Sequence, residues 1–299
     1  MTTPYKTKLT ICAVTIASVF VFPSHAKQVD SLGAMVTESD FDLNFRYRYE
    51  TVDQDSKEKD AKASTLKTRL TWKTATYNNF SAAVEVDNVL VIGADDYNDT
   101  HNGKTDYPVV ADPEDTDLNQ LYLKYKGKKL TFVGGRQRIL HGSQRFVGGV
   151  GWRQNEQTYD GARFQVGINK NFNFDYSYVA NVNRIFGPKD GAQPADWEGD
   201  FHLANANWTL AKKHKLTAFA YLLDNEDNAG ASSNTFGVDY SGNFGPLSAN
   251  LSYATQSDAG DNTNDYSADY YKAEFSTKVS GLKLIAGLEV LGSDNGVGF

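Results

Sequence analysis

The chain has 299 residues, enough for one large β domain or two ordinary ones, and its net charge of −7 excludes the basic footprint of a nucleic-acid-binding protein. Mean hydropathy is −0.50, and no run of about 18 apolar residues follows the N-terminal segment, which excludes a helical membrane protein. Membrane-spanning β-strands remain compatible with this composition, because their alternating apolar and polar residues average out as hydrophilic.

The N-terminal segment has the pattern of a secretory signal peptide. Lys6 and Lys8 supply positive charge, an apolar stretch follows them, and small residues precede a cleavage site after Ala26. We therefore expect residues 1–26 to be cleaved on export. Cleavage also removes Cys12, the only cysteine. The exported chain then has no disulfide, and a barrel's closed hydrogen-bond ladder would stabilise it instead.

Alternation of apolar and polar residues dominates the chain from Phe41 onward. Phe45 and Tyr47 share one face of the first such segment, and Arg46 and Arg48 share the other. A strand of about ten residues with one apolar and one charged face suits a barrel with a wet interior. The pattern recurs to the end of the chain and predicts about thirteen strands.

Long and short connections alternate between these strands. The long ones lie near 51–63, 91–117, 139–157, 184–200, 224–234 and 256–269. The short ones lie near 75–79, 127–129, 170–171, 211–214, 243–246 and 280–281. Long loops at one end and tight turns at the other are typical of an outer-membrane barrel, and a Greek-key sandwich does not keep this alternation.

The predicted fold is therefore all-β: a transmembrane, antiparallel, up-and-down β-barrel over residues 41–299, preceded by a periplasmic segment at 27–40. We expect it in the bacterial outer membrane, in contact with lipid and lipopolysaccharide. Residues 293–299 have a loop composition, and bacterial barrels have even strand numbers. We therefore expect C-terminal strands to be missing, because an open sheet edge cannot sit in lipid.

The stretch 130–164 is rich in glycine and arginine. Arginine offers a planar fork of donors that matches carboxylates, and glycine lets the backbone fold tightly. We interpret its middle, 139–157, as a loop that packs into the pore and presents cations to an anionic solute. The alternative is a surface loop with ordinary ion pairs.

Several segments resemble the alginate export family. They are 46–50 (RYRYE), 107–113 (YPVVADP) with 117–120 (DLNQ), 135–138 (GRQR), 144–148 (QRFVG) and 152–160 (WRQNEQTYD). The resemblance covers the chain from about residue 40 to its end. It implies a lumen rich in arginine and lysine that passes an anionic polyuronate, in a full-length parent of about 16–18 strands.

Passing a polyanion needs cations spaced along the lumen that bind weakly enough to release it. The candidate path residues are Arg46, Arg48, Lys67, Arg69, Lys73, Lys124 and Arg163 on inward faces, and Arg136, Arg138, Arg145 and Arg153 at the constriction. Arg136 needs a bulge at Gly134–Gly135 to turn inward. The alternative is structural: the same cations pair with Asp42, Glu50, Glu85, Asp87 and Asp175 to fill a narrow barrel.

The sequence does not indicate an enzyme. A Ser/His/Asp spacing, a His-x-x-x-His pair, a P-loop and a dinucleotide fingerprint are all absent from it. No catalytic residue, metal or cofactor is therefore predicted. The acidic stretches 111–117 and 258–265 lack EF-hand spacing, and we interpret them as solvated loops rather than calcium sites.

These observations predict a passive outer-membrane channel for an anionic saccharide or small carboxylate, with an alginate-like polyuronate as the implied solute. The alternative is a structural or adhesive barrel whose lumen is plugged by the loop at 140–159 and whose acidic outer loops do the binding. An outer-membrane hydrolase is a more distant third reading.

Overall fold

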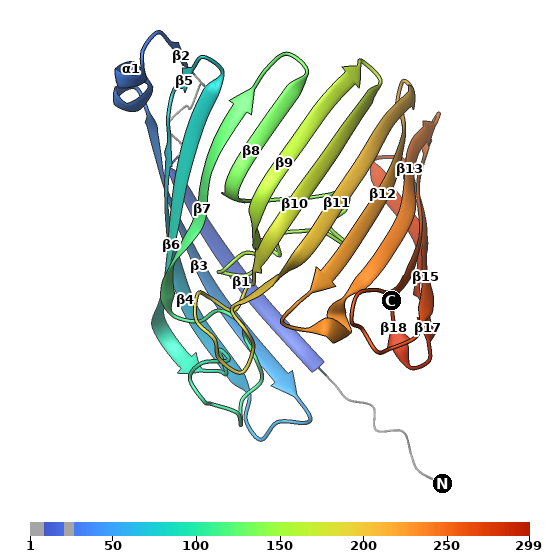
Figure 1. Cartoon of the computed structure of the whole chain (residues 1–299). Helices are drawn as coiled ribbons and strands as arrows, with labels where there is room; N and C mark the ends of the chain where they lie inside the picture. Colours follow the sequence, from blue (N-terminus) through green and yellow to red (C-terminus); the bar gives the residue numbers. More distant parts are fainter. Residues whose placement is uncertain (1–8, 21–26) are drawn as a thin grey trace.

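The computed structural model describes residues 9–20 and 27–299, so the predicted cleavage site after Ala26 lies outside the described residues. Thirteen long strands among these residues form one antiparallel sheet in which each pairs with the next along the chain (Figure 1). They are β3 (Asp40–Gln54), β4 (Ala61–Lys73), β6 (Phe80–Asp96), β7 (Asp115–Lys126), β8 (Leu130–Gln137), β9 (Thr158–Asn169), β10 (Phe172–Asn183), β11 (Asp196–Ala211), β12 (His214–Asn225), β13 (Ser233–Phe244), β14 (Leu247–Asp258), β15 (Ser267–Val279) and β16 (Leu282–Leu291). The up-and-down topology and the strand number are confirmed.

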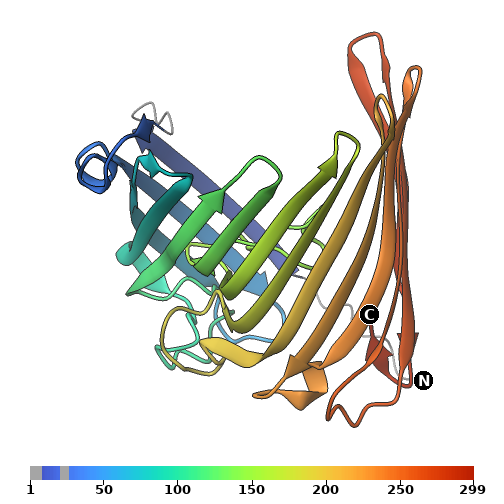
Figure 2. The same cartoon turned by 45° about the horizontal axis from the view of Figure 1, so that its top comes forward.

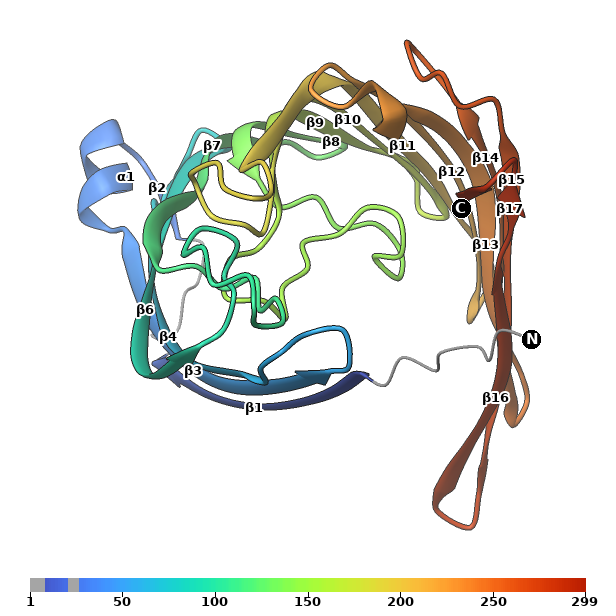
Figure 3. The same cartoon turned by 90° about the horizontal axis from the view of Figure 1, so that it is seen from below.

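The sheet curves around a central space (Figures 2 and 3). A further strand, β1 (Leu9–Phe20), lies inside the predicted signal peptide and pairs antiparallel with β3. The strand order therefore has β1 at one end and β16 at the other, and these two strands are not paired within the described part of the chain. A small hairpin of β17 (Ser293–Asp294) and β18 (Val297–Gly298) follows β16.

The sheet has an apolar outside and a charged inside. Leu121 and Leu123 on β7 are 49% and 48% exposed on the outer face. Glu50 on β3 and Asp87 on β6 are 1% and 2% exposed on the inner face. This is the reverse of a water-soluble protein, and it is the arrangement that a lipid-facing barrel with a polar lumen requires.

A short segment lies at one end of the sheet, on its outer side (Figure 3). There β2 (Gln28–Val29) pairs in parallel with β5 (Thr76–Tyr77) in the β4–β6 turn, and α1 (Leu32–Thr37) is capped by Ser31, whose Oγ accepts from the backbone N–H of Ala34 at 3.1 Å. Figure 1 shows this segment at the end that carries the short turns. Within the described residues no helix is long and apolar enough to span a membrane.

The long connections emerge at the opposite end, as the sequence predicted. The expected first long loop at 51–63 is the exception. It spans only 55–60, because β3 and β4 continue pairing to Val52 and Ala61. The loops at 97–114 and 138–157 fold into the space that the sheet surrounds (Figure 3). The β12–β13 connection contains the short helix η1 (Ala229–Ala231).

Gly135 of β8 lies against the backbone of the neighbouring strand β7, where no side chain fits. Gly135 has a φ of +119°, and a Cβ there would lie 2.3 Å from the carbonyl oxygen of Leu121. We expect Gly135→Ala to lower the free energy of unfolding by about 2–3 kcal/mol, because the backbone conformation is strained for alanine and the methyl group overlaps β7. Urea unfolding in detergent micelles, followed by fluorescence, measures this.

The matched control is Gly134→Ala, where a Cβ would meet only the movable ring of Phe132, at 3.1 Å. Equal unfolding midpoints for the two variants would contradict the predicted steric conflict at Gly135.

Candidate functional site

The loop at 138–157 connects β8 to β9 across the interior of the sheet (Figure 3). It begins where Gln137 ends β8 and returns to the wall at Thr158. Glycines and two non-glycine residues with positive φ, Gln144 and Val150, allow its tight reversals. The loop is held on two opposite sides, by polar contacts at one and by apolar contacts at the other. It matches the predicted 139–157 loop.

The polar anchor is made by two arginines of β3. Arg46 Nε donates to Gln154 Oε1 at 2.9 Å, Arg46 Nη1 donates to the Gly151 carbonyl at 2.8 Å, and Arg46 Nη2 donates to the carbonyl of Arg153. Arg48 Nη1 donates to the carbonyl of Trp152. Four acceptors of the loop, three of them backbone carbonyls, are thereby hydrogen-bonded to the wall, and these bonds fix the loop backbone.

A first cluster of ion pairs joins β3 to two loops. Arg48 Nη2 lies 2.5 Å from Glu50 Oε2, and Arg153 Nη1 lies 3.2 Å from the same oxygen. Asp112, from the loop at 97–114, lies 3.4 Å from Arg48 and accepts from the backbone N–H of Gln154 at 2.8 Å. Burial raises the pKa of Asp112, while Arg153 and the Gln154 N–H oppose this. Asp112 therefore ties the two loops together.

A second cluster is centred on Glu156. Its Oε1 accepts from Arg138 Nε at 2.8 Å, from Arg69 Nη2 at 2.5 Å and from Asn119 Nδ2 at 2.7 Å. Arg69 and Arg138 also pair with Glu85 of β6. Burial opposes ionisation of Glu156, but the Arg138 hydrogen bond and the Arg69 charge outweigh it and lower the pKa of Glu156 to about 2. The carboxylate is therefore charged at any physiological pH.

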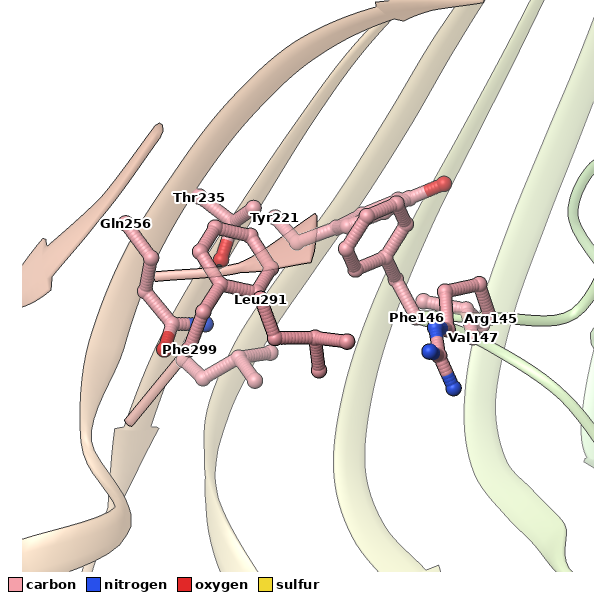
Figure 4. Close-up of a pocket in the computed structure, with 9 residues that line it drawn as sticks. Arg145, Phe146, Val147, Tyr221, Thr235, Gln256, Leu291 and Phe299 are labelled. Carbon is pink, nitrogen blue, oxygen red and sulfur yellow. Dashed lines mark hydrogen bonds between the residues drawn. The ribbon is translucent and has the colours of Figure 1, made fainter. Parts of the chain in front are cut away.

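The apolar anchor lies on the far wall. Ile139, Phe146 and Val147 pack against an aromatic group on β12 and β15 that includes Tyr221 and Tyr270. A pocket of about 310 Å³ lies at this anchor. Figure 4 shows Arg145 and Val147 of the loop on one side of it and Thr235, Gln256 and Phe299 on the other.

His141 stands beside this anchor and stacks on Tyr221 with ring centroids 5.8 Å apart. Burial lowers the pKa of His141 to about 4, against the influence of Asp175, so the imidazole is neutral at pH 7.

The remaining predicted cations are paired along the wall. These ion pairs are Lys67–Asp87 (3.6 Å), Lys73–Asp42 (3.8 Å), Arg136–Asp160 (2.8 Å), Arg145–Glu289 (2.8 Å) and Arg163–Asp175 (2.5 Å). Nine of the eleven predicted path residues therefore have a carboxylate within 4.0 Å. Arg46 and Lys124 have none among the described residues.

The expected bulge at Gly134–Gly135 is wrong. The register of β8 with β9 runs without a shift through Gly134↔Ala162, Gly135↔Gly161 and Arg136↔Asp160. Arg136 therefore keeps the phase of Phe132 and forms a two-pronged pair with its register partner. It does not join the clusters that hold the loop.

Two acidic residues central to the site were not singled out from the sequence. Asp112 and Glu156 lie in loops, where strand alternation gives no direction to a side chain. In the part of the chain that the structure describes, no group of three or more His, Cys, Asp or Glu residues is placed to hold a metal ion.

Comparison with known proteins gives a family and a fold. The alginate export family model matches residues 37–277. No curated protein sequence matches. The solved structures with similar folds include OccAB2 of Acinetobacter baumannii (19% identity, TM-score 0.68, 89% of this chain and 70% of that one) and OccK8 (OprE) of Pseudomonas aeruginosa (15%, 0.64, 89% and 71%). OpdK of Pseudomonas aeruginosa, solved with vanillate, is also similar (12%, 0.65, 85% and 67%). These neighbours are outer-membrane porin barrels.

Removing the Glu156 carboxylate leaves two partly buried guanidinium groups, those of Arg69 and Arg138, with one carboxylate partner fewer. We expect Glu156→Gln to lower the free energy of unfolding at pH 7 by about 3 kcal/mol. The pKa of Glu156 is about 2 in the folded protein and 4.5 ordinarily, so its contribution is present above pH 4.5 and is lost as the pH falls through 2. Urea unfolding at pH 7, 4 and 2.5 should show the gap between the two proteins closing.

Glu58→Gln, in the exposed loop at 55–60, is the control and should match the unaltered protein at each pH. A gap that stayed constant down to pH 2.5 would show that the Glu156 charge does not contribute to stability.

Proposed function

The chain belongs to the alginate export family, and on that premise we propose that its lumen passes an anionic saccharide or a small carboxylate passively across the bacterial outer membrane. The observation that carries the proposal is the position of the loop at 138–157. It lies inside the sheet and is held there from both walls, so it narrows the lumen to a path lined by charged groups. A solute must pass between loop and wall.

Two lumenal cations give this path its proposed preference for anions. Arg46 contacts only neutral oxygens, and Lys124 has cationic neighbours, Lys126 and Arg163. A charge without a carboxylate in contact is available to a passing anion, whereas the charges in ion pairs are largely compensated. Mid-lumen Arg46 and turn-side Lys124 therefore give two weak sites in succession.

The lining of the far wall is the observation that favours a hydroxylated solute, such as a saccharide. A hollow of about 390 Å³ lies beside Ser143 of the loop. Its inner-wall lining includes Lys215, Thr217, Asp239, Asn250, Ser252 and Lys272. These side chains offer both donors and acceptors, which suits sugar hydroxyl groups. The carboxylate alternative takes support from the vanillate in the OpdK structure, since vanillate is a carboxylate.

The same proposal includes the ends and surroundings of the chain. Residues 1–26 serve as a cleaved signal peptide. Residues 27–40 form a periplasmic segment, because β2 and α1 lie at the end with the short turns. Lipid and lipopolysaccharide contact the apolar outer face. No enzymatic activity is proposed.

The competing function is a structural or adhesive barrel with a plugged lumen. One observation favours it: nine of the eleven predicted path cations are paired, and the loop is anchored at both sides. Such a barrel would conduct no ions and would bind ligands through its outer loops alone.

Planar-bilayer recording of the full-length protein separates the two functions. We expect an anion-selective conductance. The anion/cation permeability ratio should be highest in the unaltered protein, lower in Lys124→Gln and lowest in Lys124→Glu, because each substitution in this series makes the lumen more negative by one unit of charge. Lys128→Gln, in the exposed turn at 127–129, is the matched control and should leave the ratio unchanged. If the protein is correctly folded but conducts no ions, the channel function is contradicted and the plugged structural barrel is supported.

A further inference from the structure

Trp152 lies at the point where the loop at 138–157 is most firmly held, yet its side chain is exposed. The residue is 58% exposed, whereas the two that follow, Arg153 and Gln154, are 8% and 0% exposed. Its backbone carbonyl accepts from Arg48, and the carbonyls on either side accept from Arg46. The backbone is therefore fixed while the indole projects from it.

The exposure of Trp152 differs in kind from that of the other large apolar side chains. Leu121, Trp208 and Phe275 are also about half exposed, but they belong to the outer faces of strands, where lipid covers them. Trp152 belongs to a loop inside the sheet, so its indole faces the aqueous lumen. An exposed indole in water forgoes about 2–3 kcal/mol of burial, unless something else covers it.

Two guanidinium groups lie over the indole ring and still leave the Trp152 side chain more than half exposed. The centroid of the ring lies 4.3 Å from Arg153 Cζ and 5.4 Å from Arg48 Cζ. Both arginines are already neutralised by Glu50 and Asp112. They orient the ring, and their own charges are compensated.

Arg46 supplies a cation without a carboxylate in contact, beside the backbone of Trp152. Its Nη1 lies 2.8 Å from the carbonyl of Gly151, the residue before Trp152. Three of the five N–H groups of a guanidinium are used in its bonds to Gln154, Gly151 and Arg153. One N–H on each terminal nitrogen therefore remains, and both belong to a cation with no carboxylate partner among the described residues.

We infer that Trp152 and Arg46 form a binding subsite for one uronate ring of an acidic saccharide. The apolar C–H face of the pyranose stacks on the indole, whose π face is electron-rich, and the ring carboxylate accepts from the free N–H groups of Arg46. This deepens the proposed function and rests on it. It names a pyranose that carries a carboxylate as the solute, rather than a small carboxylate alone.

The subsite explains why an aromatic residue lies beside a cation at the narrow part of the path. A passing chain needs sites that bind each sugar weakly and release it. A stacking contact is worth about 0.5–1.5 kcal/mol, which is weak enough for release. The competing role for Trp152 is purely structural: the ring would hold the loop by stacking on the two guanidinium groups.

The test is the residence time of an oligomannuronate tetramer that blocks the single-channel current. We expect Trp152→Ala and Trp152→Leu to shorten the block by about three- to tenfold, because both lose the π face. Trp152→Phe should retain most of it. Trp208→Ala, which removes a tryptophan of similar exposure (51%) from the outer face, is the control and should leave the block unchanged. An unchanged residence time in Trp152→Leu would overturn the subsite.

A second comparison tests the charge. Blocking by maltotetraose, which has no carboxylate, should be weaker than blocking by the oligomannuronate, and Arg46→Gln should remove the difference while Arg46→Lys keeps part of it. A difference that survives in Arg46→Gln would overturn the role of Arg46. Equal shortening of the oligomannuronate block in Trp152→Phe and Trp152→Leu, together with a lower unfolding midpoint in both, would assign the ring the structural role, because phenylalanine keeps a stacking face.

Failure of the proposed channel function and failure of the subsite can be told apart by experiment. If the protein conducts no ions, calorimetric titration of the oligomannuronate tetramer into the detergent-solubilised protein still tests the subsite. Binding that weakens about three- to tenfold in Trp152→Leu supports it. Absence of binding to the unaltered protein overturns it.

Discussion

The structure depends on the neutralisation of charge inside the sheet. The inner wall of β3, β4 and β6 carries the buried Arg48, the partly buried Arg69 and their buried partner carboxylates, Glu50 and Asp87. Removing one member of such a pair costs about 3–5 kcal/mol, because the other charge stays buried. Glu156 and Arg153 of the inner loop complete these pairs. The charged wall and the inner loop therefore stabilise each other, because each supplies the counter-charges that the other needs.

This mutual neutralisation also shapes the path through the lumen. The charged groups that fix the loop are largely unavailable to a solute, because their partners already satisfy them. Among the predicted path cations the pairing leaves out Arg46 and Lys124, and these two, with the indole of Trp152, are the groups to which we assign recognition in the proposed function. A lumen rich in arginine is thus far less positive than its composition indicates.

Most of the fold could be predicted from the sequence. In a barrel, the side-chain period of two decides which residues meet lipid and which meet the lumen, so the inward placement of Arg48, Lys67 and Asp87 followed from alternation alone. The carboxylates expected as structural partners of the cations, such as Glu50 and Asp175, are those partners. The position of Arg136 was not predictable in the same way, since it depended on whether Gly134–Gly135 formed a bulge or a continuous ladder.

The sequence by itself determined the strand pattern, the alternation of loops and turns, the family and the identity of the charged inner wall, because each of these is a local or periodic property. Only the tertiary structure decided that Asp112 and Glu156 neutralise that wall, that Arg46 remains without a carboxylate, and that Trp152 is exposed beside it. These facts depend on where two long loops return across the lumen. Loop backbones have no period, so a contact such as that between Arg46 and Gly151, 105 residues apart, is fixed by three-dimensional packing.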